Sequence, residues 1–599
     1  MAFLKDIPTE ELVKNVVCSV LTADEEKDRE LVNRGNGAVP YLPKYVHEKK
    51  YQSGNVKDNN VDFYAPDELS SKKGNNNSTD INERLNRLID VELRYDSSNL
   101  NDNQIILLRK MVKVSKLIDD IFLMQIYNKN FEIMKKLRGS DDEKEKLELK
   151  YFMWNKGPWD KLDDEKPFIG AEKRKDGVEF YPEDITREEF EEWLKEHPED
   201  EETFKSPFTV IRRKGEKLVA VPYSIEYKEF IEPVANLMKE AAMLTDNESL
   251  RLFLNKKAEA FLSNNYFESE VAWMDLDSDI EITIGPYEVY DDALFGYKAS
   301  FESFVTIKDR EESEKLRVYT KYLEEIDKIL PIDPKYNFTK KSQKSPIAVV
   351  NEIFAGGEAN SGYRASAFNL PNDEKVRAKK GSKKVLLKNI TESKFKNLAV
   401  PLAERIISGK QLKYLNFDTY FKFVLFHELS HGLGPSFINK NGKDIPVNES
   451  LKDLYNSIEE AKADIAGLYS MFYFVDNGVL PKDSEMEFYV AYLAGIFRAL
   501  RFGLKEAHAK GSCISYNYLK EKGAISFKKS GEFEIVLGKM RNSVTELLKD
   551  FLTLQLEGDY QLAKSFIDKY LIIGRELKNT IDATSDLPVD INPIFIFEL

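Results

Sequence analysis

The stretch Tyr420-Phe-Lys-Phe-Val-Leu-Phe-His427-Glu428-Leu429-Ser430-His431-Gly432 contains two of the five histidines in the chain, four positions apart. Apolar residues precede the histidines at helical spacing, and two glycines and a proline follow them. We therefore predict a buried helix that ends near Gly432. Because four residues make a little over one helical turn, the two imidazoles should lie on one face of that helix.

Histidines at this spacing can bind one zinc ion through neutral ring nitrogens. Glu428 lies one position further round the helix, beside the predicted metal, where its carboxylate can take a proton from an attacking water. The pattern H-E-x-x-H rarely arises by chance in a chain with so few histidines. Two hydrogen-bonded core histidines beside a capping acid would nevertheless give the same pattern, and from the residues alone this alternative stays open.

A catalytic zinc ion takes three protein ligands and keeps a fourth position open. Downstream, the stretch 457–469 has helical periodicity, and it places Glu460 and Asp464 four positions apart on one face. We predict that Glu460 is the third ligand and that Asp464 accepts a hydrogen bond from a histidine N–H. The alternative is that Ser457-x-x-Glu460 is only a capping box that begins a surface helix.

The composition excludes several classes of protein. The chain has 599 residues, 42% of them hydrophobic, which favours two large lobes over a single core. A net charge of −15 provides no basic field for nucleic acid or an anionic membrane. The two cysteines, Cys18 and Cys513, rule out a disulfide scaffold. The segment 1–21 lacks a signal-peptide pattern as it stands, although one could have preceded it, and we expect a cytoplasmic protein.

The order of predicted elements favours an α+β fold. Helical periodicity is expected from Leu88 to Leu137, and the acidic stretch 183–202 should be a solvated helix face. A hairpin is predicted at 210–221, with further strands at 281–284 and 304–307. Helices dominate from Leu402 onward; the most apolar of them, at 488–504, carries two arginines and should be buried in the protein. The polar stretch 54–82 is expected to be a surface loop.

At this point the sequence resembles the dipeptidyl-peptidase III family of zinc exopeptidases. That family follows its zinc-binding helix with Glu-Glu-(Cys/Ala)-(Arg/Lys)-Ala-(Glu/Asp), which Glu459 to Asp464 match. Most of the chain contributes to the resemblance, as four further stretches look like bacterial members: Gly157-Pro-Trp-Asp160, Phe180-Tyr-Pro-Glu-Asp184, Ala272-Trp-Met-Asp-Leu276 and Ile284-Gly-Pro-Tyr-Glu288-Val-Tyr290. They also resemble the peptidase-like half of plant proteins with an added Nudix domain, but no Nudix box occurs here.

One departure from the family pattern concerns the zinc helix. The best-studied members insert a residue and read H-E-x-x-G-H, whereas this chain has the five-residue His427-Glu-Leu-Ser-His431. The shorter spacing suits an undistorted helix and leaves zinc binding intact. It leaves open how closely the geometry of the cleft and the rates follow the family.

The resemblance implies a role for each matching residue. His427, His431 and Glu460 would be the zinc ligands, Glu428 the general base, and Glu459 and Asp464 would orient the histidines. Tyr290 and His508 would donate hydrogen bonds at the scissile carbonyl. A free substrate amine would be held by Glu288, Asn369 and Asn372, with Arg377 nearby. Without the resemblance, we would interpret His508 as an ordinary helix-surface histidine and Asn369-Leu-Pro-Asn372 as an ordinary turn. The lysine-rich stretch 375–388 could contact the carboxylate end of a peptide, but we expect it to be a solvated loop.

These observations lead to one expected architecture and function. We expect a mostly helical zinc lobe (309–345 and 406–574) and a mixed lobe with a β-barrel-like core (1–308, 346–405 and about 575–599), separated by a wide cleft that closes by a hinge. The protein should bind one zinc ion per chain and release N-terminal dipeptides from short peptides, as a monomer or weak homodimer. The alternatives are a zinc aminopeptidase or oligopeptidase of broader cleavage, and a peptide-binding protein with little turnover.

Overall fold

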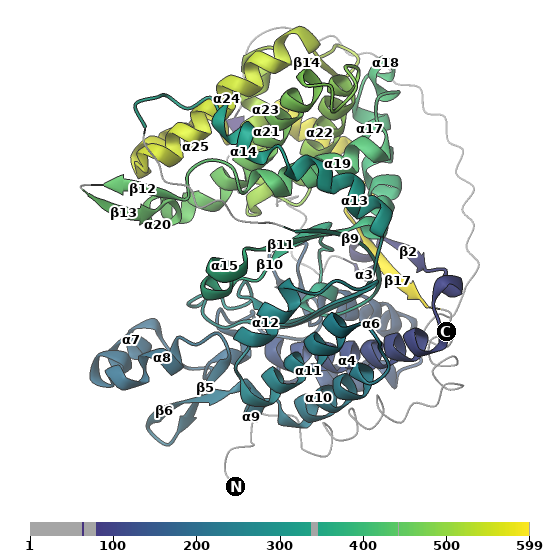
Figure 1. The fold of residues 1–599 in the computed structure, drawn as a ribbon, viewed down its shortest axis with the longest axis vertical. Coiled ribbons are helices and arrows are strands. Elements are labelled where there is room, and N and C mark those ends of the chain that lie inside the picture. The colour runs from purple at the N-terminus through teal and green to yellow at the C-terminus, as the bar shows by residue number, and fades with distance from the viewer. Residues whose placement is uncertain (1–62, 65–79, 337–345, 441, 598–599) are drawn as a thin grey trace.

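The computed structural model describes residues 63–64, 80–336, 346–440 and 442–597. The predictions for 1–21 and Cys18, and most of the loop predicted at 54–82, lie outside this part. The described residues form an α+β fold with two large hydrophobic cores (Figure 1). The mixed core takes buried residues from 93–307, 348–398 and Ile591, and the helical core takes most of its residues from 316–330 and 402–577. The residue bounds expected for the zinc lobe and the mixed lobe remain predictions.

A five-stranded sheet organises the mixed core. Its strand order is β10-β11-β9-β8-β7, antiparallel except for the parallel pair β11 and β9. The helix α4 (Asp102–Ile126) packs on β8 and β9, and begins with a capping box between Asn101 and Gln104. The strand bounds are β7 Ile280–Glu288, β8 Ser300–Lys308, β9 Ile347–Gly357, β10 Ala367–Leu370 and β11 Lys383–Leu387.

The expected β-barrel-like core is an open sheet in the described residues, because β7 and β10 lie at its two edges. The two edges nevertheless meet at one end. Asn372, just after β10, donates from Nδ2 to the carbonyl oxygen of Tyr287 in β7, at 3.1 Å. This contact brings the two predicted amine-binding segments together.

Strand β11 lies between the two cores. Because side chains alternate along a strand, Val385 and Leu387 belong to the mixed core, whereas Leu386 belongs to the helical core. Lys384 lies two positions before Leu386, so the two side chains are on the same face of the strand, and Lys384 is 3% exposed. Its side chain therefore lies on the side of the sheet that faces the helical core.

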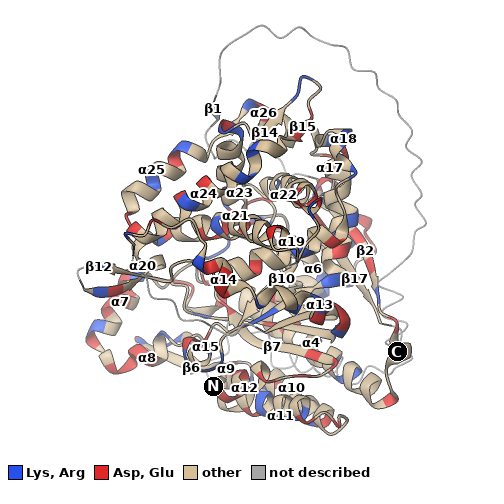
Figure 2. Ribbon diagram, turned by 45° about the horizontal axis from the view of Figure 1, so that its top comes forward, with Lys and Arg blue, Asp and Glu red and all other residues tan. Residues whose placement is uncertain are grey.

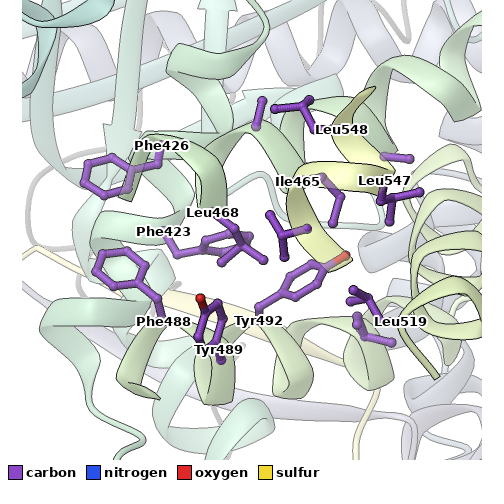
Figure 3. Packing of buried hydrophobic residues seen from close by; sticks show 14 of the residues in the cluster. Phe423, Phe426, Ile465, Leu468, Phe488, Tyr489, Tyr492, Leu519, Leu547 and Leu548 are labelled. Carbon is purple, nitrogen blue, oxygen red and sulfur yellow. The ribbon is translucent and has the colours of Figure 1, made fainter. Parts of the chain in front are cut away.

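The helical core is built from long helices whose apolar faces interlock (Figure 3). Phe426 of α19 stacks on Phe488 of α22 with a centroid distance of 5.3 Å. The helices that surround the metal motif are α13 Arg310–Thr320, α19 Phe417–Ser430, α21 Tyr455–Asp476, α22 Ser484–Leu500, α23 Ala507–Glu521, α24 Leu537–Glu557 and α25 Tyr560–Tyr570. The hairpin β12 Phe437–Lys440 and β13 Lys443–Pro446 extends from this half (Figure 1).

One sequence prediction about this fold is wrong. The residues Leu88 to Arg94 form a strand, β2, instead of the first turns of a helix. The strand pairs in parallel with β17 (Asp590–Ile596), near the other end of the chain. The partner supplies the backbone hydrogen bonds that local helix formation would otherwise satisfy.

Other expected elements are confirmed. The hairpin consists of β5 Thr209–Lys214 and β6 Lys217–Pro222, and the acidic stretch forms α7 Arg187–Glu196, which buries only Phe190. The apolar stretch at 488–504 lies largely in α22 and is buried. Acidic and basic residues are interspersed over both halves (Figure 2). Among the described helices, none has the length and apolarity to cross a bilayer.

The remaining longer helices complete the two halves. Next to the mixed core lie α5 Asn130–Arg138, α6 Glu143–Asn155, α10 Lys228–Ala242, α11 Glu248–Ser263, α12 Phe267–Met274, α15 Glu374–Lys380 and α16 Lys388–Lys394. Next to the helical core lie α14 Leu323–Lys328, α17 Val400–Ile406, α20 Val447–Leu451 and α26 Arg575–Ala583.

Candidate metal centre

Three ligand atoms converge where α19 passes α21. The Nε2 atoms of His427 and His431 are 3.2 Å apart. Glu460 places Oε2 at 3.3 Å from His427 Nε2 and at 3.8 Å from His431 Nε2. The helix that carries both histidines is regular up to Ser430, as the five-residue spacing predicts.

The other ring nitrogens are held by carboxylates. His427 Nδ1 is 2.7 Å from Asp464 Oδ1, and His431 Nδ1 is 2.9 Å from Glu459 Oε1. Because an ionised carboxylate only accepts hydrogen bonds, each ring donates from Nδ1 and keeps a lone pair on Nε2. Gln555, on α24, donates to the second oxygen of Glu459 at 2.7 Å and fixes that carboxylate in turn.

This donor set fits a zinc ion. Two imidazole lone pairs and one carboxylate face each other, and acceptors at such distances repel unless a cation lies between them. Burial alone would raise the pKa of Glu459, but the positive charge of Lys462 beside it lowers that pKa to about 2. Two nitrogens and one carboxylate oxygen are the ligands of many catalytic zinc sites.

The structure settles one alternative left open by the sequence. The capping-box interpretation of Ser457 and Glu460 is wrong, because α21 begins at Tyr455 and both residues lie inside it. The pairing of His427 with His431 suits both a shared metal ion and a hydrogen bond between the two rings, so the metal site stays a prediction.

A glycine allows the two metal-bearing helices to lie close together. A Cβ on Gly467 of α21 would lie 3.3 Å from the backbone nitrogen of His427. That spacing is tighter than ordinary van der Waals contact, so a larger residue would push α19 away from α21. The absence of a side chain at Gly467 therefore helps to set the distance between His427 and the acids of α21.

Glu428 lies on α19 between the two histidines and is partly buried. A buried lysine, Lys384 of β11, lies close enough for their charges to interact. Burial lowers the pKa of Lys384 to about 8, and the negative charge of Glu428 opposes that shift. The sequence analysis missed this residue. It placed Lys384 in a solvated loop, whereas the stretch forms α15 and β11 and buries both Lys383 and Lys384.

The two residues expected at the scissile carbonyl come from different halves of the molecule. His508, at the start of α23, has Nε2 3.1 Å from Glu460 Oε2 and Nδ1 2.6 Å from Glu506 Oε1. Although burial opposes it, these carboxylates raise the pKa of His508 to about 9. Tyr290 follows β7 with 76% of its surface exposed, and the charges of Glu288 and Glu460 raise its pKa. Both residues therefore lie within the electrostatic reach of Glu460.

The expected amine-binding residues lie at the end of the sheet where its edges meet. Asn372 Nδ2 donates to Glu288 Oε1 at 3.2 Å. The side-chain oxygen of Asn369 is a buried acceptor without a partner in the described structure. Burial raises the pKa of Glu288, and the Asn372 hydrogen bond only partly offsets that effect. An acid and an unpaired acceptor of this kind suit a cationic ligand.

Arg377 does not join this group directly. Its guanidinium donates to Glu374 on the same helix, α15, at 3.1 Å. Two acids that the sequence analysis missed, Glu302 of β8 and Glu358 after β9, lie within the electrostatic reach of Glu288. Burial, and then the charge of Glu288, raises the pKa of Glu302. Only the fold brings these acids together, since they are separated in sequence by more than fifty residues.

Two cavities among the described residues lie away from this site. They have volumes of about 400 and 350 Å³ and are lined by residues around Glu172–Ile185 and around Met274–Arg317, and none of the predicted site residues lines either one. The candidate site is identified by the convergence of its donor and acceptor atoms.

Comparisons with known proteins agree with this geometry. A model described as peptidase family M49 matches residues 199–480. The solved structure of dipeptidyl-peptidase III from Caldithrix abyssi is 46% identical, with a TM-score of 0.84 over 86% of this chain and 98% of that one. The structure of dipeptidyl-peptidase III from Corallococcus sp. strain EGB is 39% identical, with a TM-score of 0.79 over 86% and 97%. A protein named Nudix hydrolase 3 from Arabidopsis thaliana is 35% identical over 573 residues, which cover 86% of this chain and 74% of that protein.

Proposed function

Because the chain belongs to peptidase family M49 and is a metallopeptidase, we propose that it removes dipeptides from the free amino end of short peptides. The observation that carries the proposal is the pairing of two sites. Three groups on α19 and α21 could hold a metal ion, and an acid with an unpaired amide oxygen lies at the edges of the sheet.

His427, His431 and Glu460 would hold the zinc ion. When bound, zinc would polarise the substrate carbonyl and make water more acidic. Glu428 would take the proton of the attacking water and then return it to the leaving amine. Tyr290 and His508 would donate hydrogen bonds to the carbonyl oxygen as it becomes negative.

The amine site would set the length of the product. Glu288 and the side-chain oxygens of Asn369 and Asn372 would hold the substrate's α-ammonium. An extended peptide advances about 3.3–3.6 Å per residue, so a fixed amino end selects the bond that reaches the metal. A fixed distance from the amine site to the metal distinguishes an exopeptidase from the alternative, an oligopeptidase of broader cleavage.

Product analysis on a free peptide of about eight residues tests the proposal. We expect a dipeptide from the amino end as the first product, followed by successive dipeptides. Release of single residues would favour an aminopeptidase, and scattered internal cuts would favour an oligopeptidase. No cleavage by the zinc-loaded protein would favour a peptide-binding protein.

Acetylation of the substrate should weaken cleavage through the same interaction as Glu288→Gln. Each change alone is expected to lower kcat/KM by roughly ten- to a hundredfold, because a charged hydrogen bond to a buried acid is lost. Together they should cost little more than either one, since they break one interaction. The matched control is Glu404→Gln, which changes an exposed glutamate on α17. Equal cleavage of free and acetylated peptides would contradict the proposed amine site.

A further inference from the structure

We infer that Tyr287, anchored by the buried Lys257, is a positioning residue that aims Glu288 at the substrate amine. This inference rests on the proposed function of Glu288. It concerns residues that would not themselves touch the substrate. Three features of the described structure carry it: a β-bulge, a buried anchor and a shared hydrogen bond.

The bulge lies at Tyr287. Along β7 and β8, Pro286 pairs with Phe301 but Glu288 pairs with Ser300, so Tyr287 is an extra residue in β7. Regular alternation would place Glu288 on the same side as Pro286. The shift places it instead opposite Ser300, on the side that Glu302 also occupies. The bulge therefore decides which way the Glu288 carboxylate points.

The side chain of Tyr287 is held in the mixed core. Its hydroxyl accepts from Lys257 Nζ at 3.1 Å and lies within donating distance of the carbonyl oxygen of Ile284, at 2.9 Å, and of Glu270 Oε1, at 3.3 Å. Lys257, on α11, is fully buried and forms an ion pair with Glu270 of α12. Two helices thus fix the ring of the bulged residue.

The strand itself leaves room for this ring. A Cβ on Gly285 would lie 3.1–3.3 Å from the ring and hydroxyl of Tyr287, and Gly285 has a φ of +156°, which other residues rarely adopt. Glycine at this position therefore lets the Tyr287 ring fold back over β7. A larger residue would press on the ring from the strand side.

The backbone of Tyr287 also orients the second amine-binding residue. Asn372 Nδ2 donates both to the carbonyl oxygen of Tyr287, at 3.1 Å, and to Glu288 Oε1, at 3.2 Å. With its nitrogen used in this way, the side-chain oxygen of Asn372 is left to accept from a ligand. A displacement of Tyr287 would therefore disturb Glu288 and Asn372 together.

Tyr287→Phe is the sharpest test, because it removes only the anchoring hydroxyl and leaves the direct ion pair of Lys257 with Glu270 in place, although each loses its contact with that hydroxyl. We expect KM for a free peptide to rise about three- to tenfold, with kcat within about twofold of the native value. Discrimination against the acetylated peptide should fall by the same factor. Combined with Glu288→Gln, the substitution should have little further effect.

Tyr266→Phe is the matched control. Tyr266 is also buried beside Lys257, its ring centroid 5.6 Å from Nζ, but its hydroxyl has no partner in the described residues. This variant should leave KM and kcat unchanged, and thermal unfolding should be similar in both variants. Gly285→Ala, which displaces the ring from the other side, should raise KM as Tyr287→Phe does.

Several results would overturn the inference: a KM for Tyr287→Phe equal to that of the control, a loss in kcat instead, full additivity with Glu288→Gln, or a chain that no longer folds. Failure of the proposed function gives a different result, because the native protein itself would then not discriminate between free and acetylated peptides.

Discussion

Replacing Glu428 with Gln is expected to lower kcat by at least about 100-fold while zinc stays bound. The amide keeps the shape of the side chain on α19 but cannot accept a proton from the attacking water. The three predicted ligands are untouched, so the metal content should remain one zinc ion per chain. Steady-state kinetics and metal quantification on the same sample measure both effects.

The matched control is Glu404→Gln, which changes an exposed glutamate on α17 in the same way. It should leave kcat and zinc content at native values. A Glu428→Gln enzyme with near-native kcat would show that another group takes the proton. Loss of zinc from that variant would instead show that Glu428 helps to bind the metal.

Removal of the metal is expected to abolish activity, and zinc alone should restore it. Metal analysis of the active protein should find one zinc ion per chain. Glu460→Ala removes one of three ligands and should weaken zinc binding by more than about 100-fold, the upper range for loss of a group that only orients a ligand. Two acceptor nitrogens 3.2 Å apart would remain, but without the carboxylate that completes the site.

Competition with a zinc chelator, read by metal content and independently of turnover, measures this change in affinity. Glu404→Ala serves as the control and should bind zinc as tightly as the native chain. An active protein without zinc, or a Glu460→Ala variant with native zinc affinity, would contradict the predicted ligand set.

The candidate metal site could be predicted from the sequence because the spacing of its residues is local. His427 and His431 share a helix face through the helical repeat alone, and Glu460 and Asp464 do so on a second helix. The contacts of His427 with Asp464 and of His431 with Glu459 agree with the residues expected to orient the rings. Only the packing of α19 on α21 could not be predicted from the residues.

The parts that could not be predicted depend on distant partners. In one case the signal was local: Ile89, Val91 and Leu93 alternate with Asp90, Glu92 and Arg94, a strand pattern that the sequence analysis merged with the helix that follows. Only the partner strand, β17, could not be predicted from the residues. Lys384 belongs to a stretch rich in lysine, which normally indicates solvent, but the pairing of β11 with β9 and β10 buries it. The bulge at Tyr287 likewise appears only when β7 is paired with β8.

The pairing of β2 with β17 also has a consequence for synthesis of the protein on the ribosome. Asn592 donates to Asp90, 502 positions earlier, and the fully buried Asp590 accepts from the backbone of Arg364. All of the mixed core except Ile591, and then the helical core, which ends at Leu577, are translated before β17. Strand β2 must wait unpaired until β17 has been made. Such a late, long-range closure makes folding slow and leaves an open strand edge to be shielded in the meantime.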